Sequence, residues 1–484
     1  MQKIDDFANF YAILLLENNI IAMFGKHSCF VLQKEAIIKR EQFTKFIEDH
    51  VLNLFTGSEI ADIEESTPRD AIVAQGIGGT VMIKFNKSDD YRITIKRVQP
   101  FKSFEINLLK TIIEEMSLIY SLNITSDYIS DMEPYIIEKA ICKALTTTAN
   151  KTLHSLLRAL EGWSQRTYEG NDASFGFIIS SKRAGKKSNP NLKLINLLKS
   201  DFSALLSDGI NTVLEISTDG YLTDYLTVPK TFDQALLVPY QYIRVASLCT
   251  GNKIGVSLIP NGDILIFKEK TLLFAKRNGK WISFSHEEII SKLADRTGDY
   301  TQEVRKAIYL SSLDTSFAKT GGCIVHLNKE DYFNVLKHID ICDCLNENCY
   351  DYKMQENISQ SFFFDATLSQ DIQPFDEFLR EEKMIKTANL IQLIGGRKFF
   401  DLDRKLRLEL MSIDGATVID ADGAILAVGA IIKIEAGSTG GGRLAAAKTL
   451  SKYGMSIKIS NDGRMEGFRM DKNKLRVKPL FVLG

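Results

Sequence analysis

The first part of the chain shows mainly the spacing of amphipathic helices. Apolar residues recur at intervals of three and four residues, and the segments with this spacing are 5–23, 40–55, 101–120 and 131–160. Residues 81–85 and 91–98 alternate instead and predict a hairpin. The glycines of the run 76–80 lead into a strand and not into a helix. We therefore interpret this run as a turn, with a phosphate loop as the alternative.

Two polar stretches follow these helices. Residues 161–170 contain Trp163, Arg166 and Tyr168, which suit either a capped helix end with a buried tryptophan or a stacking pocket for a ring. After a short strand at 174–179, the basic run 181–190 predicts a mobile loop or a domain linker, with a phosphate-binding arm as the alternative.

The centre of the chain changes to a period of two. A helix is predicted at 191–206, and residues 211–285 then alternate in short runs that predict an antiparallel meander, with strands at 212–218, 221–228, 242–248, 253–259, 263–268, 271–276 and 280–284. Asp219-Gly220, Asn261-Gly262 and Asn278-Gly279 are hairpin turns. A helix at 285–293 follows, with Ser285 as a plausible N-cap and Glu288 three residues later.

The stretch from Ser412 to Asp462 has the order strand, turn, strand, glycine loop, helix, strand. Its strands are predicted at 417–419, 425–432 and 456–460, and a helix begins at Arg443 after the glycine-rich loop 437–442. Glycines let backbone N–H groups approach an anion, and the new helix directs its positive end toward it. The stretch therefore suits phosphate handling, although either the Asp414-Gly415 turn or the glycine loop alone is also explained as a plain structural turn or loop.

Composition excludes several classes of protein. The chain has 484 residues, enough for two or three domains, of which 45% are hydrophobic and 25% are charged. Its net charge of −1 argues against nucleic-acid binding. Seven cysteines, an N-terminus unlike a secretory leader and no run long enough to span a bilayer predict a cytoplasmic protein with no membrane contact.

The stretch from Ser412 to Asp462 resembles the catalytic domain of the diadenylate cyclases, which join two ATP molecules into cyclic di-AMP. That family has an Asp-Gly-Ala motif, a two-strand hairpin and a Thr-Arg-His-Arg motif that opens a helix of the form AAxxLS. Asp414-Gly415-Ala416 is complete here, and 446–451 matches the helix. Residues 305–327 are similar to the family's first helix and strand, with Gly321-Gly322 at the join, so the resemblance covers roughly 300–470.

The chain departs from the family pattern at the charged positions. Arg443 falls on the first Arg of the motif, Leu444 and Ala445 replace its His and second Arg, and Gly442 replaces its Thr. Asn461-Asp462 replaces a Glu pair after the last strand. Loss of cations that stabilise a transition state typically costs a hundredfold or more in rate. This pattern resembles that of degenerate relatives thought to act as nucleotide sensors.

The resemblance implies roles for several residues. Asp414 would serve the 3′-hydroxyl and a Mg²⁺ or Mn²⁺ ion, Arg443 would serve the phosphates, and Asp462 is a further possible metal ligand. The nucleotide-binding positions implied are Gly415, Ala416, Gly440, Gly441, Gly442, Arg443 and Leu444, and an apolar slot for adenine would be lined by Ile413, Ala416, Val428 and Leu444. An active cyclase would also need a homodimer through the C-terminal domain.

A second cluster comprises His338, Cys342, Cys344 and Cys349. Its C-x-C-x4-C spacing is unlike that of common zinc fingers and lacks a second cysteine pair, so reduced cysteines in an exposed loop are the favoured interpretation and a metal site is the alternative. The other histidines suggest no hydrolase.

We therefore predict an α/β protein, α+β overall, in three parts. These are a helix-rich domain at 1–190, a helix and antiparallel meander at 191–298, and a diadenylate-cyclase-like domain with a mixed sheet and flanking helices at 299–484. The leading hypothesis is a sensor or weak cyclase that binds ATP or a cyclic dinucleotide. An active diadenylate cyclase is one alternative, and a non-catalytic scaffold for a partner protein is another.

Overall fold

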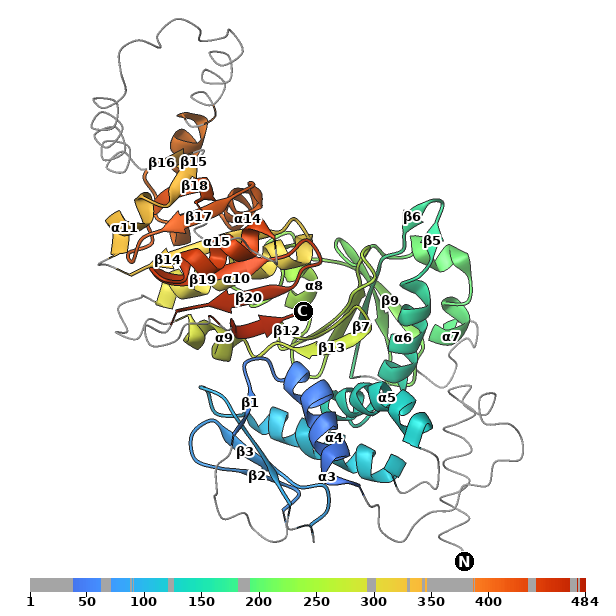
Figure 1. Cartoon of the computed structure of the whole chain (residues 1–484). Helices are drawn as coiled ribbons and strands as arrows, with labels where there is room; N and C mark the ends of the chain where they lie inside the picture. Colours follow the sequence, from blue (N-terminus) through green and yellow to red (C-terminus); the bar gives the residue numbers. More distant parts are fainter. Residues whose placement is uncertain are drawn as a thin grey trace, which may run out of the picture. The chain divides into compact units, whose positions relative to one another are not determined.

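The computed structural model shows a mixed α/β architecture with several sheets, as predicted (Figure 1). Two compact units are formed by Met1–Asn53, Glu59–Lys96 and Pro100–His154, and by Leu54–Ser58, Arg97–Gln99 and Ser155–Gly484. The residues that the structure describes are 38–61, 71–87, 89, 91–120, 126–181, 192–293, 302–328, 331–341, 344–345, 386, 388–433, 441–470, 477 and 479–484. The predicted helix at 5–23, the loop at 182–190 and the domain boundaries near 190 and 298 lie outside them and stay predictions.

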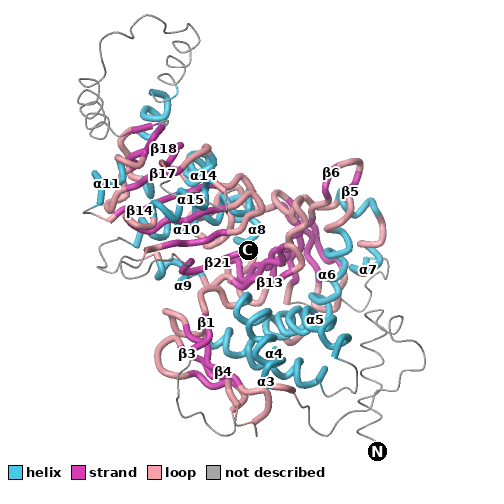
Figure 2. Tube along the Cα trace, in the orientation of Figure 1, coloured by secondary structure: helices cyan, strands magenta, loops and turns pink. Residues whose placement is uncertain are grey.

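The first unit contains a four-stranded antiparallel sheet in the order β1-β4-β3-β2 and several helices (Figure 2). Its strands are β1 (Glu59–Ala61), β2 (Val73–Gln75), β3 (Thr80–Ile83) and β4 (Ile93–Lys96), and its helices are α3 (Arg40–Phe46), the π-helix η1 (Ile47–Leu52), α4 (Ser103–Tyr120), α5 (Ser126–Leu145) and the start of α6 (Asn150–Trp163). The β3–β4 hairpin is confirmed. Gly78 has a φ of +66° between β2 and β3, so residues 76–80 form the predicted turn.

The helix predicted at 131–160 is instead two helices. α5 ends at Leu145 and α6 begins at Asn150, and between them Thr146 Oγ accepts a hydrogen bond from the Ala149 N–H (3.2 Å). A threonine side chain that bonds to a nearby backbone group favours a turn over a continued helix. Trp163, at the end of α6, is 3% exposed and donates through Nε1 to the Leu198 carbonyl (3.0 Å). The buried-tryptophan interpretation is thus confirmed.

The described part of the second unit contains two large sheets and a two-stranded one, β5 (Thr167–Tyr168) with β6 (Asn171–Asp172). The first large sheet has seven strands in the order β13-β12-β11-β10-β7-β8-β9. These strands are β7 (Phe175–Ile179), β8 (Thr212–Ile216), β9 (Leu222–Thr227), β10 (Ile254–Leu258), β11 (Ile264–Lys268), β12 (Thr271–Arg277) and β13 (Lys280–Ser283). The three predicted hairpin turns join β8 to β9, β10 to β11 and β12 to β13, and their glycines all have positive φ.

Three predictions for this region are wrong. The sheet is not a purely antiparallel meander, because β7 inserts between β10 and β8 and runs parallel to β8. Residues 242–248 form a turn and helix α8 (Ile243–Ser247) instead of a strand; the buried positions 242, 243, 245 and 246 have helical spacing. The helix expected at 191–206 is reduced to α7 (Leu194–Leu197) and a 3₁₀ turn (Asp201–Leu205), interrupted at Ser200, which has an extended backbone.

The predicted capping box of the helix at 285–293 is also wrong. α9 (His286–Lys292) does follow Ser285 as its N-cap, without a capping side-chain hydrogen bond. The Glu288 carboxylate accepts hydrogen bonds from the backbone N–H groups of Val98 (3.1 Å) and Gln99 (2.6 Å). Its role is therefore to hold a distant segment of the same unit against α9.

The second sheet has eight strands in the order β15-β18-β17-β14-β19-β20-β21, with β16 beside β18. They are β14 (Gly322–Leu327), β15 (Ile339–Ile341), β16 (Cys344–Leu345), β17 (Ala416–Ile419), β18 (Ile425–Ile432), β19 (Gly454–Ile459), β20 (Met465–Phe468) and β21 (Pro479–Leu483). β14 and β17 are parallel, and the other pairs are antiparallel. The mixed sheet predicted for this region is thus present.

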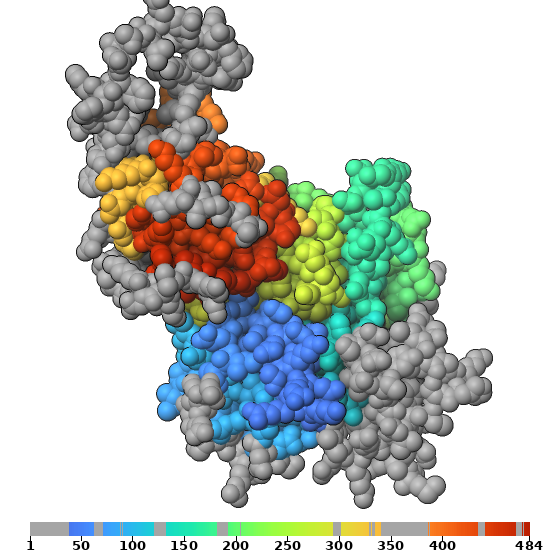
Figure 3. All heavy atoms as spheres, viewed as in Figure 1, coloured from blue at the N-terminus to red at the C-terminus, as the bar shows by residue number. Residues whose placement is uncertain are grey.

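Helices cover this sheet on both faces, and alternate residues of each strand face opposite cores. α10 (Gln302–Ala318) and α14 (Arg404–Ser412) share a hydrophobic cluster with strand residues such as Ile324 and Ile457. α15 (Gly442–Leu450) packs in a second cluster with Cys323, Val325 and Val418. In Figure 3 the atoms of the residues after 400, coloured orange to red, gather on one part of the visible surface. Among the described residues, no helix is long and apolar enough to cross a membrane.

Candidate functional site

Four connecting segments meet at one edge of the eight-stranded sheet. β14 and β17 are parallel, so both begin at this edge, and the antiparallel β19 ends there, with Gly322 paired to Ile459. The joins that precede β14 and β17 therefore lie near the turn after β19. Topology thus brings together 319–321, 413–415 and 460–464, and contacts of α15 add its first turn.

Arg443, in the first turn of α15, connects two of these segments. Its Nη1 donates a hydrogen bond to Asn461 Oδ1 (2.6 Å), and its Nη2 lies 3.8 Å from Asp414 Oδ1. The side chain is 30% exposed and that of Asp414 is 88% exposed, so the pair is open to solvent. Three of the positions singled out in the sequence, Asp414, Arg443 and Asn461, are therefore neighbours although they are spread over 48 residues.

Gly321 provides the space for this contact. A Cβ added there would lie 2.3 Å from both Arg443 Nη1 and Asn461 Oδ1, and its φ of +69° itself disfavours other residues. In the sequence Gly321 marked only the join of helix and strand. Thr320 and Ser412, which the sequence did not single out, join the two segments through a hydroxyl contact of 2.8 Å.

The three residues of the Asp-Gly-Ala motif differ in exposure and backbone conformation. Asp414 is exposed, Gly415 has a φ of +109°, and Ala416 is buried as the first residue of β17. A Cβ on Gly415 would lie 2.4 Å from the Gly429 carbonyl carbon, which is a clash with backbone. The glycine therefore lets β18 pass close by while the chain turns Asp414 out to solvent.

The start of α15 is built from glycine. Gly441 is the N-cap, with a φ of +84°, and an added Cβ at Gly441 or Gly442 would meet no atom of the described residues within 4 Å. A helix N-terminus presents backbone N–H groups and a partial positive charge, and here Arg443 adds a full one. Gly440 and the rest of the predicted loop, 434–440, lie outside the described residues.

The predicted adenine slot does not form from its four residues together. Val428 belongs to the core cluster on the α10 and α14 face of the sheet, and Ile413 packs against that cluster. Ala416 belongs to the cluster on the α15 face, and Leu444 packs against it. Because neighbouring strand positions face opposite sides, the sequence could not show which of them share a face.

The two proposed metal ligands, Asp414 and Asp462, are carboxylates and so have suitable donor atoms for a divalent ion. Asp414 offers an exposed carboxylate, and Asp462 Oδ1 accepts a hydrogen bond from the Arg464 N–H (3.1 Å) at the β19–β20 turn. Within the described ranges there is no group of three or more His, Cys, Asp or Glu residues that could hold a metal. Mg²⁺ commonly uses one or two carboxylates together with substrate phosphates, so Asp414 suits that mode.

The second predicted cluster lies largely outside the described residues. Cys342 and Cys349 belong to that excluded part, and Cys344 lies in β16. His338 is placed, and its Nε2 is 2.6 Å from the hydroxyl of Tyr453. The zinc hypothesis for these residues stays untested.

No family model, curated protein or solved structure matches this chain.

Proposed function

We propose that the edge formed by Gly321, Asp414, Arg443 and Asn461 binds the phosphates of an adenine nucleotide. The observation that carries the proposal is the position of Arg443: its guanidinium lies between a neutral amide and a carboxylate 3.8 Å away, at the N-terminus of a helix. A guanidinium has five N–H donors in a planar fork that matches phosphate oxygens. Within the described part of the chain, its one hydrogen bond is to Asn461.

The groups at this edge suit a phosphate of low charge, such as a phosphodiester. α15 starts at Gly442, where an added Cβ would meet no atom of the described residues within 4 Å, and we expect a phosphate to approach the first turn of the helix there. One cation and one helix N-terminus stabilise a diester phosphate more readily than a departing pyrophosphate, because the charge to be neutralised is smaller. We therefore favour a sensor for a cyclic dinucleotide or ATP over rapid turnover.

A second candidate function, a slow diadenylate cyclase, is favoured by the exposure of Asp414. A carboxylate that is 88% exposed beside Arg443 is accessible to a hydroxyl and a metal ion. A divalent ion, if bound, would bridge Asp414 to the phosphates and neutralise their charge. In the resembled family this reaction needs two domains face to face, so this candidate also predicts a homodimer in the presence of ATP.

The deciding experiment is calorimetric titration of the full chain with ATP and with cyclic di-AMP, with Mg²⁺ or Mn²⁺. We expect binding that weakens in Arg443→Ala and persists in Lys448→Ala, which removes an exposed cation from the same helix. Absence of heat with either nucleotide would reject the proposal and leave the scaffold hypothesis. Mass-spectrometric detection of cyclic di-AMP from ATP, lost in Asp414→Asn but not in Asp422→Asn, would select the cyclase.

A further inference from the structure

We infer that Arg277 is a positioning residue for this site and acts through the turn that carries Asn461. The inference rests on the proposed function, but its structural part can be tested without a nucleotide. Arg277 is the last residue of β12, in the seven-stranded sheet, and is 4% exposed. It therefore belongs to a different sheet from the one beside which the site lies.

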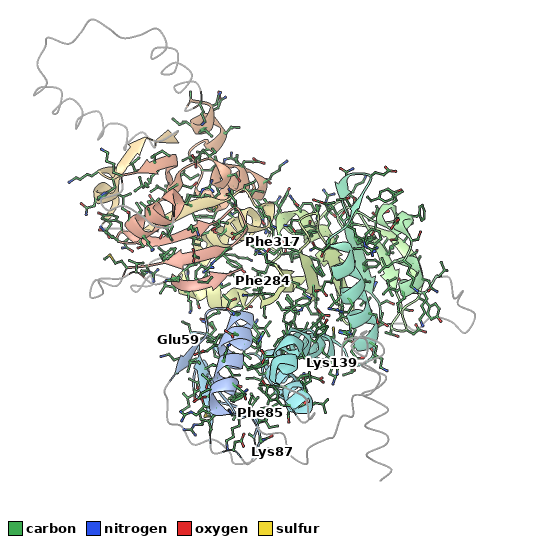
Figure 4. The ribbon with its side chains drawn as sticks, turned by 45° about the vertical axis from the view of Figure 1, so that its right-hand side comes forward. Glu59, Phe85, Lys87, Lys139, Phe284 and Phe317 are labelled. Atoms are coloured by element: carbon green, nitrogen blue, oxygen red, sulfur yellow. The ribbon has the colours of Figure 1, made fainter. Side chains whose placement is uncertain are left out.

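The guanidinium of Arg277 donates to four acceptors on three separate segments. Its Nε bonds to Asp263 Oδ2 (3.0 Å), which compensates the buried charge. Its Nη1 bonds to Ser316 Oγ (2.9 Å) and the Gly463 carbonyl (3.1 Å), and its Nη2 bonds to the Ser316 carbonyl (3.0 Å). Its Cζ lies 4.4 Å from the ring centre of Phe317, a residue of α10 that is labelled in Figure 4.

These contacts hold the turn after β19 in place. The Gly463 N–H donates a hydrogen bond to the Ser460 carbonyl (2.9 Å). The Gly463 carbonyl accepts hydrogen bonds from the Arg277 guanidinium and from the Ser316 hydroxyl. Gly463 has a φ of +87°, and a Cβ there would lie 2.1 Å from Arg277 Nη2. Glycine is thus required for the guanidinium to approach. Asn461 lies inside this turn and orients Arg443.

The same guanidinium also holds the end of α10. Ser316 precedes Gly321 by five residues, and Gly321 leaves the space in which Arg443 meets Asn461. One side chain therefore fixes both segments that bound this space. An ion pair with Asp263 alone would not need the hydrogen bonds that Arg277 makes to the other two segments. The planar guanidinium of arginine holds several acceptors at fixed angles, whereas the ammonium group of lysine does not.

The first test is a double-mutant cycle in the full chain, measured as affinity for ATP and cyclic di-AMP. Arg277→Lys keeps a cation beside Asp263, so the core charge stays paired. We expect Arg277→Lys and Asn461→Ala each to weaken binding roughly tenfold, and the double variant to bind no more weakly than the weaker single variant. Losses that multiply, or an unaltered affinity in Arg277→Lys, would overturn the inference.

A control separates positioning from general destabilisation. Leu272→Ala opens a cavity on the same strand, β12, where Leu272 is fully buried, without touching the turn. Its effect on affinity should multiply with that of Asn461→Ala. If Arg277→Lys fails to fold, Ser316→Ala removes the hydroxyl that links Arg277 to Gly463 and leaves the buried ion pair intact.

The second test needs no nucleotide. Amide hydrogen exchange of Gly463 should become faster in Arg277→Lys and Ser316→Ala, while exchange of Ser456 inside β19 stays as in the wild type. Unchanged exchange at Gly463 would overturn the inference. If the wild type binds no nucleotide, the proposed function fails, and this measurement still decides whether Arg277 positions the Asn461 turn.

Discussion

Two arginines of the second unit, Arg404 and Arg443, differ in burial and in the number of hydrogen bonds that they donate. Arg404 is fully buried and uses all of its donors: Nε and Nη2 bond to Asp314 (2.6 and 2.7 Å), and the other donors bond to the carbonyls of Gln234, Leu236 and Val238. Arg443 is partly exposed and donates one hydrogen bond, to Asn461, within the described residues. The saturated guanidinium is a structural clamp, whereas the open one has donors available for a ligand.

The comparison also shows how burial determines the meaning of an ion pair. Burial raises the pKa of Asp314, and the charge and hydrogen bonds of Arg404 oppose that increase. Such a pair is weak evidence for net stability, but removal of one partner is costly because the other charge stays buried. The pair of Arg443 and Asp414 is accessible to solvent, chiefly at Asp414, and screening leaves such an ion pair worth at most about 1 kcal/mol. Stability and binding should therefore respond to different arginines.

The largest effect is expected from Arg404→Ala. Loss of the guanidinium leaves Asp314 without its partner in the core, which typically costs about 3–5 kcal/mol of unfolding free energy. Urea denaturation should show this loss, while Lys405→Ala, an exposed neighbour on α14, should change little. The deficit should shrink as the pH falls, because protonation of Asp314 removes the unpaired charge. A loss below about 1 kcal/mol would remove the distinction between the two arginines.

The next effect tests the space around Arg443. Gly321→Ala places a Cβ against Arg443 and Asn461 at a positive φ, so we expect a loss of about 1–2 kcal/mol in stability and roughly a tenfold loss in nucleotide affinity. Gly251→Ala, outside the site, has a similar positive φ of +61° but its Cβ would meet no atom of the described residues within 4 Å. It should share the stability loss and keep most of the affinity. Equal affinities for the two variants would contradict the assigned role of Gly321.

A purely functional effect is expected from Arg443→Ala. Its exposed ion pair should contribute less than about 1 kcal/mol to stability. A charge-assisted hydrogen bond to phosphate is worth about 1.5–3 kcal/mol, so affinity should fall roughly ten- to a hundredfold. Thermal unfolding and calorimetry on the same sample measure both quantities, with Lys448→Ala as the control. A large fall in melting temperature would place Arg443 with the structural arginines.

The smallest effect concerns an anion held mainly by backbone amides. Burial disfavours the charged form of Asp208, but N–H groups of Ile210, Asn211 and Thr212 outweigh it and lower its pKa to about 2. Since this folded-state pKa is below the usual value of 3.8, its contribution to stability is present above pH 4 and is lost as the pH falls toward 2. Asp208→Asn should reduce that acid dependence, measured by urea denaturation between pH 2 and 5. An unchanged slope, judged against Asp224→Asn, would contradict the assignment.

Much of the local structure could be predicted, and the errors have physical causes. Asn-Gly and Asp-Gly turns correctly located three hairpins because those residues accept positive φ at little cost. Residues 242–248 were assigned the wrong period because a short apolar run fits both a strand and a helix. The strand at 174–179 was not predicted to belong to the same sheet as the strands after residue 211. Its parallel pairing with β8 leaves no local pattern in the sequence, because parallel strands are joined by a long connection.

The sequence by itself determined the turns, most of the strands and the chemistry available at Asp414 and Arg443, because these follow from local backbone preferences and from residue type. Only the tertiary structure decided that Arg443 meets Asn461 across Gly321, and that Val428 and Ala416 belong to opposite faces of one sheet. It also decided that Arg277, from another sheet, reaches the same turn. Strand order and register set these contacts, and packing over the whole unit fixes both.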